Sequence, residues 1–434
     1  MDSLVQDSPE AGVFRVHRKV FLDAEIFERE MERIFEATWV FVALDSEIPN
    51  PHDFVTRHIG RQPMILMRDA SGRLGGFLNS CRHKGTLLCP FRAGNRKFHT
   101  CPYHGWSYDS AGRNVGITDH KDGAYPPAFD AENHDLIPLA RVDSYRGFVF
   151  ASLAADVPGL DEHLGDARIL LDLVADQAPE GLEYIPGEAS YTYDGNWKLQ
   201  FENGLDAYHF STTHAAFVDI VRQRPRGAPP AKPPGEIIAG TISMPRGHAM
   251  SWSVGAPGQE PESRPLVRDA QLLQRVSDRV GAARLDWMLR QRNLTIFPNL
   301  QIIDIQSLQL RTWQPLAVDK TRMSSHCLAP RGESAPARRF RIRQYEEFFN
   351  AGGLATSDDN VMYALSQGGF AATAAGDTQG YSRGMATSLA ASEAFAALGT
   401  SQARYNASPA GLSFGDETAI HAGYREWHRL MCSR

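Results

Sequence analysis

The sequence predicts an α+β protein that combines a small all-β domain with a larger mixed domain. Apolar residues at helical spacing between charged ones predict a helix over residues 21–39. From about residue 41 to 153 the pattern changes to short strand-like runs broken by turn signals, Asp-Ala-Ser-Gly at 69–72 and Asp-Ser-Ala-Gly at 109–112. After residue 155, helix-like and strand-like runs alternate. We therefore expect an N-terminal helical segment over residues 1–40, an all-β domain over 41–155 and an α+β domain over 156–434.

Individual elements follow from the same periodicities. Strands of the small domain are predicted at residues 53–58, 63–68, 75–79 and 147–151. In the larger domain we expect helices over 160–176 and 266–292, and strands over 189–192 and 300–309. Two stretches, 225–234 and 255–265, are so rich in proline or glycine that they should form surface loops or covers, because proline lacks the backbone donor of regular structure.

Composition excludes several classes of function. The 434 residues are 42% hydrophobic and 22% charged, which is typical of a globular protein. A net charge of −6 argues against nucleic acid as a partner. There is no apolar run of 18 residues and no basic, apolar leader at the amino terminus, so we expect a cytoplasmic protein with no membrane partner. Five cysteines do not make a disulfide framework, and we interpret Cys89, Cys327 and Cys432 as free thiols.

Two cysteines and two histidines alternate along the small domain. Seventeen residues separate Cys81-x-His83 from Cys101-x-x-His104, and a glycine follows each pair closely. A Cys2His2 zinc finger keeps its two cysteines together, whereas each turn here supplies one ligand of each kind. If the turns face each other, both thiolates can bind one iron and both imidazoles the other, as in a Rieske [2Fe-2S] centre. A zinc site, or buried residues without a metal, is the alternative.

A second group of metal ligands is predicted in the segment NWKLQFENGLDAYHFSTTH, residues 196–214. Asp206 and His209 are three residues apart and would share a helix face. His214 comes five residues after His209, about 140° further around an ideal helix, so a shared metal requires the helix to end or distort between them. The Ser-Thr-Thr run before His214 favours such a break, because these side chains compete for backbone hydrogen bonds. Histidines with no metal, in the core or at the surface, are the alternative.

A carboxylate from further along the chain would complete such a site. A 2-His-1-carboxylate iron site needs one acid and keeps positions open for O2 and substrate. In GGLATSDDNVMYALSQ, residues 352–367, we expect Ser357 to cap a helix whose first turn holds Asp358 and Asp359. Acids in a first turn usually interact with the helix dipole, so local sequence assigns neither as a ligand. The two metal patterns support each other, because a Rieske cluster delivers single electrons and a non-heme iron consumes them with O2.

With these motifs the chain resembles, over nearly its whole length, the large (alpha) subunit of Rieske non-heme iron aromatic ring-hydroxylating oxygenases. The segments IFEATWVFVALDSEIPN, YTYDGNWKLQFENGLDAYH and RIRQYEEFFNAGGLATSDD are most similar to the benzoate, toluate, anthranilate and 2-halobenzoate 1,2-dioxygenase group. The resemblance implies an all-β Rieske domain combined with a helix-grip, START-like catalytic domain that contains an antiparallel sheet.

The resemblance also implies roles for individual residues. The implied Rieske ligands are Cys81, His83, Cys101 and His104, and the implied ligands of a mononuclear Fe(II) are His209, His214 and Asp359. Asp206 would link His104 of one subunit to His209 of the next in a trimer, and Asn203 would lie near the iron. The chain departs from the family at Lys84, usually Arg, and departs from benzoate-type relatives at Phe201, Leu205, Ala207 and Phe210.

The implied activity is that of a terminal oxygenase in aromatic catabolism. It would use O2 and electrons from an NADH-dependent reductase, with or without a ferredoxin, to convert an aromatic carboxylate to a cis-diol, or to a catechol after loss of substituents. A small beta subunit in an α3β3 assembly, or a homotrimer, is expected. A ring monooxygenase such as a salicylate hydroxylase, a Rieske electron carrier and a zinc-stabilised binding module are the alternatives. An Arg or His should neutralise the substrate carboxylate, but the sequence does not identify it.

Overall fold

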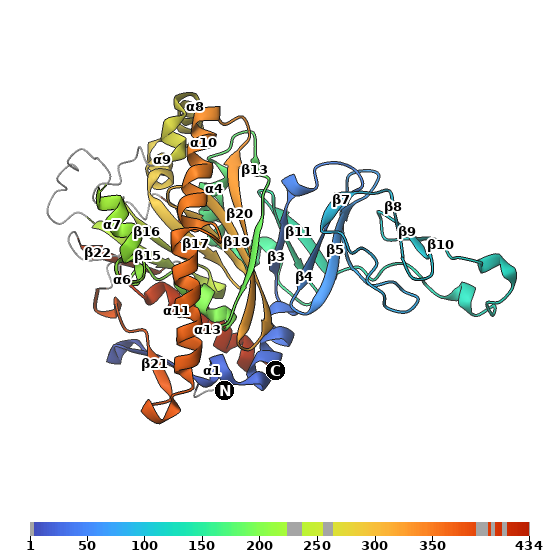
Figure 1. Ribbon diagram of the computed structural model, residues 1–434, viewed down its shortest axis with the longest axis horizontal. Coiled ribbons are helices and arrows are strands. Elements are labelled where there is room, and N and C mark those ends of the chain that lie inside the picture. Colours follow the sequence, from blue (N-terminus) through green and yellow to red (C-terminus); the bar gives the residue numbers. More distant parts are fainter. Residues whose placement is uncertain are drawn as a thin grey trace. The chain divides into compact units, whose positions relative to one another are not determined.

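The chain divides into two compact units. The computed structural model describes residues 4–223, 237–254, 264–387, 398–400, 404–409 and 415–433. One unit is Phe35–Leu160, and the other combines Met1–Ile34 with Asp161–Arg434 (Figure 1). The predicted loop at 225–234 lies outside the described residues, as does the loop at 255–265 apart from its last two positions.

The smaller unit is built from antiparallel strands, as the sequence predicted. Its sheets have the orders β6-β5-β4-β7, β10-β9-β8 and β11-β12-β3. The strands are β3 (Val40–Leu44), β4 (Asp53–Ile59), β5 (Gln62–Arg68), β6 (Leu74–Leu78), β7 (Ala93–Asn95), β8 (Phe98–Thr100), β9 (Ser107–Asp109), β10 (Asn114–Gly116), β11 (Arg141–Tyr145) and β12 (Phe148–Ser152).

The two predicted turn signals form hairpins by the same hydrogen bonds. Asp69 Oδ1 accepts from the amides two and four residues later at 2.8 and 3.0 Å, and Asp109 Oδ1 does the same at 2.9 and 3.0 Å. The turns close with Gly72 and Gly112 at φ of 83° and 82°, a conformation that glycine adopts without a steric penalty. These turns therefore fix the β5-β6 and β9-β10 pairings.

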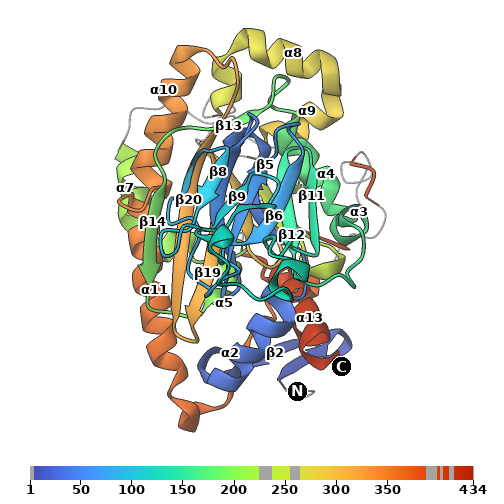
Figure 2. The ribbon, with the colours of Figure 1, turned by 90° about the vertical axis from the view of Figure 1, so that its right-hand side faces the viewer.

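The larger unit is organised around an antiparallel sheet of nine strands in the described part of the chain. Its order is β13-β20-β19-β18-β17-β16-β15-β22. Strand β14 also pairs with β20, and the two lie side by side in Figure 2. The strands are β13 (Leu182–Tyr184), β14 (Ala189–Tyr193), β15 (Ile237–Ser243), β16 (Ala249–Ser253), β17 (Gln291–Ile296), β18 (Leu300–Asp304), β19 (Leu308–Ala317), β20 (Lys320–Pro330) and β22 (Arg404–Pro409). A separate small sheet joins β1 (Val5–Ser8), β2 (Val13–His17) and β21 (Thr378–Gly380).

Helices cover both faces of the nine-stranded sheet. The described helices are α1 (Lys19–Leu22), α2 (Ala24–Glu30), α3 (Leu160–Leu164), α4 (Ala167–Ala175), α5 (Trp197–Asn203), α6 (Phe210–Thr213), α7 (Ala215–Gln223), α8 (Ala270–Val280), α9 (Ala282–Leu289), α10 (Ala335–Gln344), α11 (Leu354–Phe370) and α13 (Thr418–Cys432). Gln200 of α5 donates to Gln301 at 3.0 Å on one face. On the other face, Trp252 packs edge-on against Trp287 of α9 with ring centroids 5.1 Å apart.

A buried acidic side chain holds α2, α5 and α13 together. The Glu30 carboxylate is 0% exposed and accepts hydrogen bonds from three donors of other helices. Trp197 Nε1 donates at 2.8 Å, Lys198 Nζ at 2.5 Å and Trp427 Nε1 at 2.6 Å. Because Lys198 is itself buried, its charge depends on Glu30 for compensation. This cluster fixes the position of α5, which leads directly into the residues predicted to bind iron.

The predicted helices occur, but single residues interrupt them. The predicted helix at 21–39 is divided by Asp23, which caps α2 by accepting from the amides of Glu25 and Ile26 at 2.8 and 3.2 Å. The regular part then ends in a π-helical segment, Met31–Phe35. Gly165, with φ of 49°, lies between α3 and α4 within the predicted helix at 160–176.

Two other predicted elements were too long. The helix predicted at 266–292 is split by Gly281 at φ of 77°, and its last two residues already belong to strand β17. The strand predicted at 300–309 is two strands, β18 and β19, joined by residues 305–307. The five cysteines are all free thiols. Among the described residues, no helix combines the length and apolarity needed to cross a bilayer.

We predict that Glu30→Ala destabilises the larger unit by about 3–5 kcal/mol, because it leaves a buried ammonium group and two indole donors without an acceptor. The double variant Glu30→Leu with Lys198→Met should recover much of this loss, since it removes both charges. Urea unfolding followed by circular dichroism measures both effects. Glu162→Ala is the control: this side chain is 69% exposed and pairs with Arg246, so its loss should cost less than about 1 kcal/mol. Equal effects in the two single variants would contradict the prediction.

Candidate metal centres and active site

The predicted Cys-His pairs lie on two turns of the smaller unit with the same backbone hydrogen bonds. The amide of Cys81 donates to the carbonyl five residues later at 2.8 Å, and the amide of Cys101 does the same at 2.8 Å. Gly85 and Gly105 each donate back to the cysteine carbonyl at 3.0 Å, with φ of 71° and 75°. The two glycines therefore supply the left-handed conformation that each turn requires. Repeated backbone geometry presents one thiol and one imidazole from each turn.

The side chains of these turns come together in like pairs. The rings of His83 and His104 are 4.5 Å apart between centroids, and Cys81 and Cys101 are buried in direct contact with each other. His83 Nδ1 is buried and has no hydrogen-bond partner among the described residues. Burial raises the pKa of the Cys101 thiol, so a thiolate there needs a compensating cation. Two adjacent thiols, two adjacent imidazoles and an unsatisfied ring nitrogen fit the ligand division of a Rieske cluster.

The hydroxyl of Tyr108 is a feature of this site that the sequence did not reveal. Its oxygen lies 3.4 Å from Cys81 Sγ and accepts from the amide of Arg82 at 3.1 Å. Hydrogen bonds to ligand sulfur tune the reduction potential of iron–sulfur clusters. No pattern in the sequence distinguishes this tyrosine from any other tyrosine in a buried strand. Lys84, the position at which this chain departs from the family, is exposed on the turn that carries Cys81 and His83.

In the larger unit, a broken helix brings the two predicted iron-binding histidines together. Helix α5 ends at Asn203, and Gly204 packs so closely on Gln301 that a Cβ there would lie 1.3 Å from its Nε2 atom. The short helix α6 has His209 and His214 at its two ends, and their Nε2 atoms are 3.3 Å apart. The predicted break before His214 is confirmed. The prediction that Asp206 and His209 share a helix face is wrong, because both precede α6, although Asp206 Oδ2 still lies 3.4 Å from His209 Nδ1.

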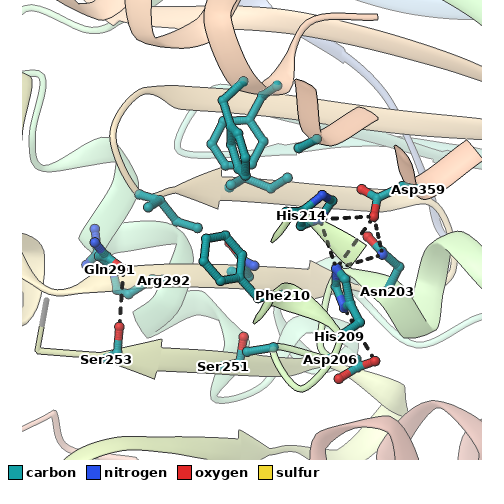
Figure 3. A pocket seen from close by; sticks show the side chains of 18 of the residues that line it. Asn203, Asp206, His209, Phe210, His214, Ser251, Ser253, Gln291, Arg292 and Asp359 are labelled. Atoms are coloured by element: carbon teal, nitrogen blue, oxygen red, sulfur yellow. Dashed lines mark hydrogen bonds and ion pairs between the residues drawn. The ribbon is translucent and has the colours of Figure 1, made fainter. Parts of the chain in front are cut away.

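Helix α11 supplies the carboxylates, and their directions distinguish the two neighbouring acids. Asp359 is buried, and its Oδ1 lies 3.5 Å from His209 Nε2 and 3.3 Å from His214 Nε2 (Figure 3). The Asp358 side chain is 40% exposed, and its Oδ2 lies 3.4 Å from the outer nitrogen, Nδ1, of His214. The predicted cap was wrong: α11 begins at Leu354, and Ser357 Oγ donates to the carbonyl of Gly353 at 3.0 Å. Asp359 therefore faces inward, and Asp358 orients His214 from behind.

These three inward atoms form a site suited to a divalent metal ion. His209, His214 and Asp359 offer ligand atoms that all lie within 4.8 Å of one another. Atoms that share a first-row metal at about 2.1 Å lie about 3 Å apart, which is close to the observed spacing. Asn203 Nδ2 contacts the same group, 3.1 Å from Asp359 Oδ1 and 3.3 Å from His209 Nε2. The donor set is that of the 2-His-1-carboxylate class, which leaves positions open for other ligands.

The electrostatics of the site also favour a cation. Burial lowers the pKa of His209, but Asp206 and Asp359 outweigh this effect and the net pKa is raised. Burial opposes ionisation of Asp359, yet contacts with His214 and His209 keep its pKa below the usual value. The site therefore stabilises a negative carboxylate and attracts positive charge. Two carboxylates, Asp206 and Asp358, contact the outer nitrogens, an arrangement that fixes ring orientation in metal sites.

A cavity of about 130 Å³ opens beside the three ligands. Its apolar walls and its polar groups come from the segment α5 to α7, the sheet, the π-helical segment Tyr345–Phe349 and α11. The lining includes Ala207, Phe210, Phe217, Ile303, Ile305, Phe348, Phe349 and Ala355, together with Ser251, Ser253, Gln291, Arg292, Asn293, Gln306 and Arg311. In Figure 3, Phe210 lies between the ligand group and the polar residues Gln291 and Ser253.

Of the four departures from benzoate-type relatives, only Ala207 and Phe210 line this cavity. The Phe201 ring is instead buried against Phe297 and Tyr424, and Leu205 is fully buried. The neighbouring Glu202 also has structural contacts: Tyr381 and Tyr424 donate to its carboxylate, and burial raises its pKa to about 7.

Comparison with known families assigns both units. Residues 38–135 match the Rieske [2Fe-2S] domain, and residues 183–431 match the ring hydroxylating alpha subunit (catalytic domain). The chain belongs to the ring-hydroxylating oxygenase alpha subunits. It is therefore a ring-hydroxylating dioxygenase of the Rieske class, and the cofactors expected from its sequence, a [2Fe-2S] cluster and a mononuclear iron, are those of this family.

Relatives at 40% identity or more are named for aromatic carboxylates. Toluate 1,2-dioxygenase subunit alpha of Pseudomonas putida is 42% identical, covering 86% of this chain and 82% of that protein. The 2-halobenzoate 1,2-dioxygenase large subunit of Burkholderia cepacia is 40% identical, covering 86% and 81%. Among solved structures, naphthalene 1,2-dioxygenase with indole bound in the active site has a TM-score of 0.82 at 25% identity, covering 99% of this chain and 94% of that chain.

We predict that Asp359→Ala removes the mononuclear iron, because it deletes the inward carboxylate, whereas Asp358→Ala retains a site whose iron affinity falls about 10- to 100-fold. Iron per chain, measured by mass spectrometry after dialysis against graded chelator, separates the two variants. The visible circular dichroism of the Rieske cluster should stay unchanged in both and serves as the internal control. Equal iron loss in both variants would show that the two acids do not have distinct roles.

Proposed function

We propose that this chain is the terminal oxygenase subunit that adds both atoms of O2 to adjacent ring carbons of an aromatic carboxylate. The observation that carries the proposal is the buried 2-His-1-carboxylate group beside an apolar cavity with phenylalanine walls. An apolar cavity of about 150 Å³ is large enough for benzene. A cavity of about 130 Å³ therefore favours a single aromatic ring over a fused polycycle. The relatives named for toluate and 2-halobenzoate support a benzoate-type substrate.

The reaction balances with one arene, one O2, two electrons and two protons giving one cis-diol. Substrates with a suitable ortho group would lose it and the carboxyl group to give a catechol. When bound, the Rieske cluster supplies electrons singly and the mononuclear iron supplies O2 activation. In our assignment Cys81 and Cys101 hold one iron of the cluster and His83 and His104 the other. The mononuclear iron is held by His209, His214 and Asp359.

The remaining residues of the site act by position. Phe210, Phe348 and Phe349 provide flat apolar walls that exclude water from a bound ring. Asp358 orients the His214 imidazole through a hydrogen bond at Nδ1, and Asp206 places a negative charge 3.4 Å from His209 Nδ1. The amide of Asn203 donates toward Asp359 and so fixes the direction of that carboxylate. These contacts hold the three ligand atoms in place before substrate enters.

We further propose that Asp206 carries electrons between subunits. One of its oxygens contacts His209 Nδ1, and the side chain is 25% exposed, which leaves it accessible to a second imidazole. In a trimer that imidazole would be His104 of a neighbouring copy. The proposed assembly includes a small beta subunit, as α3β3, or is a homotrimer, and an NADH-dependent reductase acts directly or through a ferredoxin. We place the reaction in the cytoplasm, where NADH is available.

The proposed domain limits are 1–40 for an N-terminal segment of the catalytic domain, 41–155 for the Rieske domain and 156–434 for the catalytic domain. The division of the chain at Phe35 and Leu160 supports these limits. The Rieske family match at 38–135 supports them as well.

The proposed substrate class predicts tight coupling on an aromatic acid. The reconstituted complex should consume NADH, O2 and acid in a ratio near one to one on at least one of benzoate, anthranilate, 2-halobenzoates, toluates and salicylate. Isotopically labelled O2 should place two labelled atoms in the product, whereas a monooxygenase would place one. Naphthalene is the control arene and should be oxidised poorly. Uncoupled O2 use on every acid, with coupled use on a neutral arene, would reject the proposal.

The proposed bridge predicts that Asp206→Asn lowers turnover by about 100-fold while both metal centres stay loaded, because the amide cannot carry the negative charge that links two imidazoles. Steady-state rates and rapid-freeze spectroscopy of cluster reoxidation measure the effect, and the loss should appear in cluster reoxidation. Asp194→Asn is the control, since that side chain is 83% exposed. Normal cluster reoxidation in Asp206→Asn would remove the bridge.

A further inference from the structure

Arg311 is a buried cation on the wall of the active-site cavity. It lies on β19, where it pairs in register with Gln301 of β18, and it is 2% exposed. It lines the same cavity as the three metal ligands. Its guanidinium lies 5.9 Å from the ring centre of Phe349, one of the apolar walls. A buried positive charge therefore lies in the cavity wall beside the apolar ring of Phe349.

Among the described residues, Arg311 differs from the other buried arginines in having no acidic partner. Its Nη2 donates only to neutral acceptors, Thr356 Oγ1 at 2.8 Å and the Phe349 carbonyl at 3.3 Å. Its Nε is buried and has no partner among the described residues. By contrast, Arg341 pairs with Glu333 at 2.6 Å. Across the described ranges of the chain, no Asp or Glu oxygen lies within 4.0 Å of the Arg311 guanidinium.

An unpaired buried guanidinium is costly to the fold. Taking a charge out of water without a counter-ion costs several kcal/mol, so buried charges in proteins are normally paired. A structural arginine would pair with an acid of its own chain, as Arg341 does. The missing anion at Arg311 points to a ligand that enters the cavity and carries a negative charge. A carboxylate suits the planar fork of donors that an arginine presents.

The place of Arg311 also fits the chemistry of the site. Thr356, which accepts its hydrogen bond, lies on α11 three residues before the metal ligand Asp359, and residues at that spacing share a helix face. An anion bound by Arg311 would therefore lie about one helix turn from the metal ligands. The ring carbon that bears this anion would then be among the ring atoms nearest to the metal ligands.

We propose that Arg311 binds the carboxylate of the aromatic substrate and thereby places the carboxyl-bearing carbon and its ortho neighbour at the metal ligands. The inference rests on the proposed function, because it requires an acidic substrate. Beyond the proposed function, the inference names Arg311 as the residue that selects acids over neutral arenes. It also explains why oxygen would be added beside the carboxyl group.

Arg292 is the other arginine of the cavity lining, and its environment argues against the same role. It pairs with Asp304, which also pairs with Arg264. Neighbouring residues of a strand point to opposite faces of a sheet. Asp304 accepts a hydrogen bond from Gln177, and its other partner Arg264 donates to Met288 of α9, so Asp304 lies on the face of the sheet that carries α9. Because Arg292 pairs with Asp304, its side chain points to that face too. In the variant Arg292→Gln, Asp304 would still pair with Arg264. This variant is therefore a matched control that removes one arginine from the cavity lining.

The test compares an acid with its neutral isostere on the assembled oxygenase. Dissociation constants for benzoate and benzamide, measured by isothermal titration calorimetry, report the contribution of the negative charge. In Arg311→Gln we expect benzoate affinity to fall about 10- to 100-fold, with benzamide affinity changed less than about 3-fold. Arg311→Lys should recover part of the preference, because it keeps the charge but loses the planar fork. Arg292→Gln should leave the preference for benzoate unchanged.

Each outcome bears on one proposal. If Arg311→Gln keeps the wild-type preference for benzoate, or if Arg292→Gln abolishes it, the role of Arg311 is overturned while the proposed function stands. If the wild-type complex binds neutral arenes and no acid, the proposed function itself fails. Should Arg311→Gln not fold, Thr356→Val decides: loss of the hydroxyl that holds the guanidinium should weaken benzoate about 3- to 10-fold and spare benzamide. Unchanged benzoate affinity in that variant would overturn the inference.

Discussion

The convergence of three lone pairs is the constraint on which the catalytic unit depends. The Nε2 atoms of His209 and His214 and an oxygen of Asp359 lie within 3.5 Å of one another, and the nearby amide of Asn203 can donate to only part of this set. When none of the three carries a proton, atoms held this close repel each other unless a cation lies between them. The fold has to hold them against that repulsion, which it does by burying the Asp359 side chain and by anchoring α5 through the Glu30 cluster.

Charge is distributed around this site in two layers with different tasks. The inner carboxylate belongs to Asp359, and the outer carboxylates of Asp206 and Asp358 each contact the far nitrogen of one histidine. The inner acid is buried and the outer ones are partly exposed, so only the outer pair can respond to a partner outside the chain. Aspartate thus serves both as a metal ligand and as a group that orients a histidine. The direction and the burial of the side chain distinguish the two roles.

Much of this site could be predicted from the sequence, because ligand spacing is a local property. The Cys-His turns and the break between His209 and His214 follow from neighbouring residues, and the small domain was predicted as all-β from short strand-like runs separated by turn signals. Other features were not predictable because they depend on contacts between distant segments. Position 204 has to be glycine because Gln301 of strand β18 occupies the space of a side chain, and Arg311 differs from the other buried arginines in lacking an acidic partner among the described residues. The cap predicted at Ser357 was wrong because α11 begins at Leu354 with Gly353 in the N-cap position, so that Ser357 already lies inside the first turn.

The substrate specificity of this cavity then depends on whether the bound ring carries a charge that compensates the buried guanidinium. Apolar walls such as Phe210 and Phe348 bind any ring of suitable size, since dispersion and burial are indifferent to substituents. A buried guanidinium without a counter-ion changes this, because a neutral ring leaves the cost of burial in place while an acid removes it. The discrimination therefore arises mainly from an unfavourable free state of the protein. That state is maintained because Thr356 and the Phe349 carbonyl hold Arg311 through neutral hydrogen bonds, which fix its position without satisfying its charge.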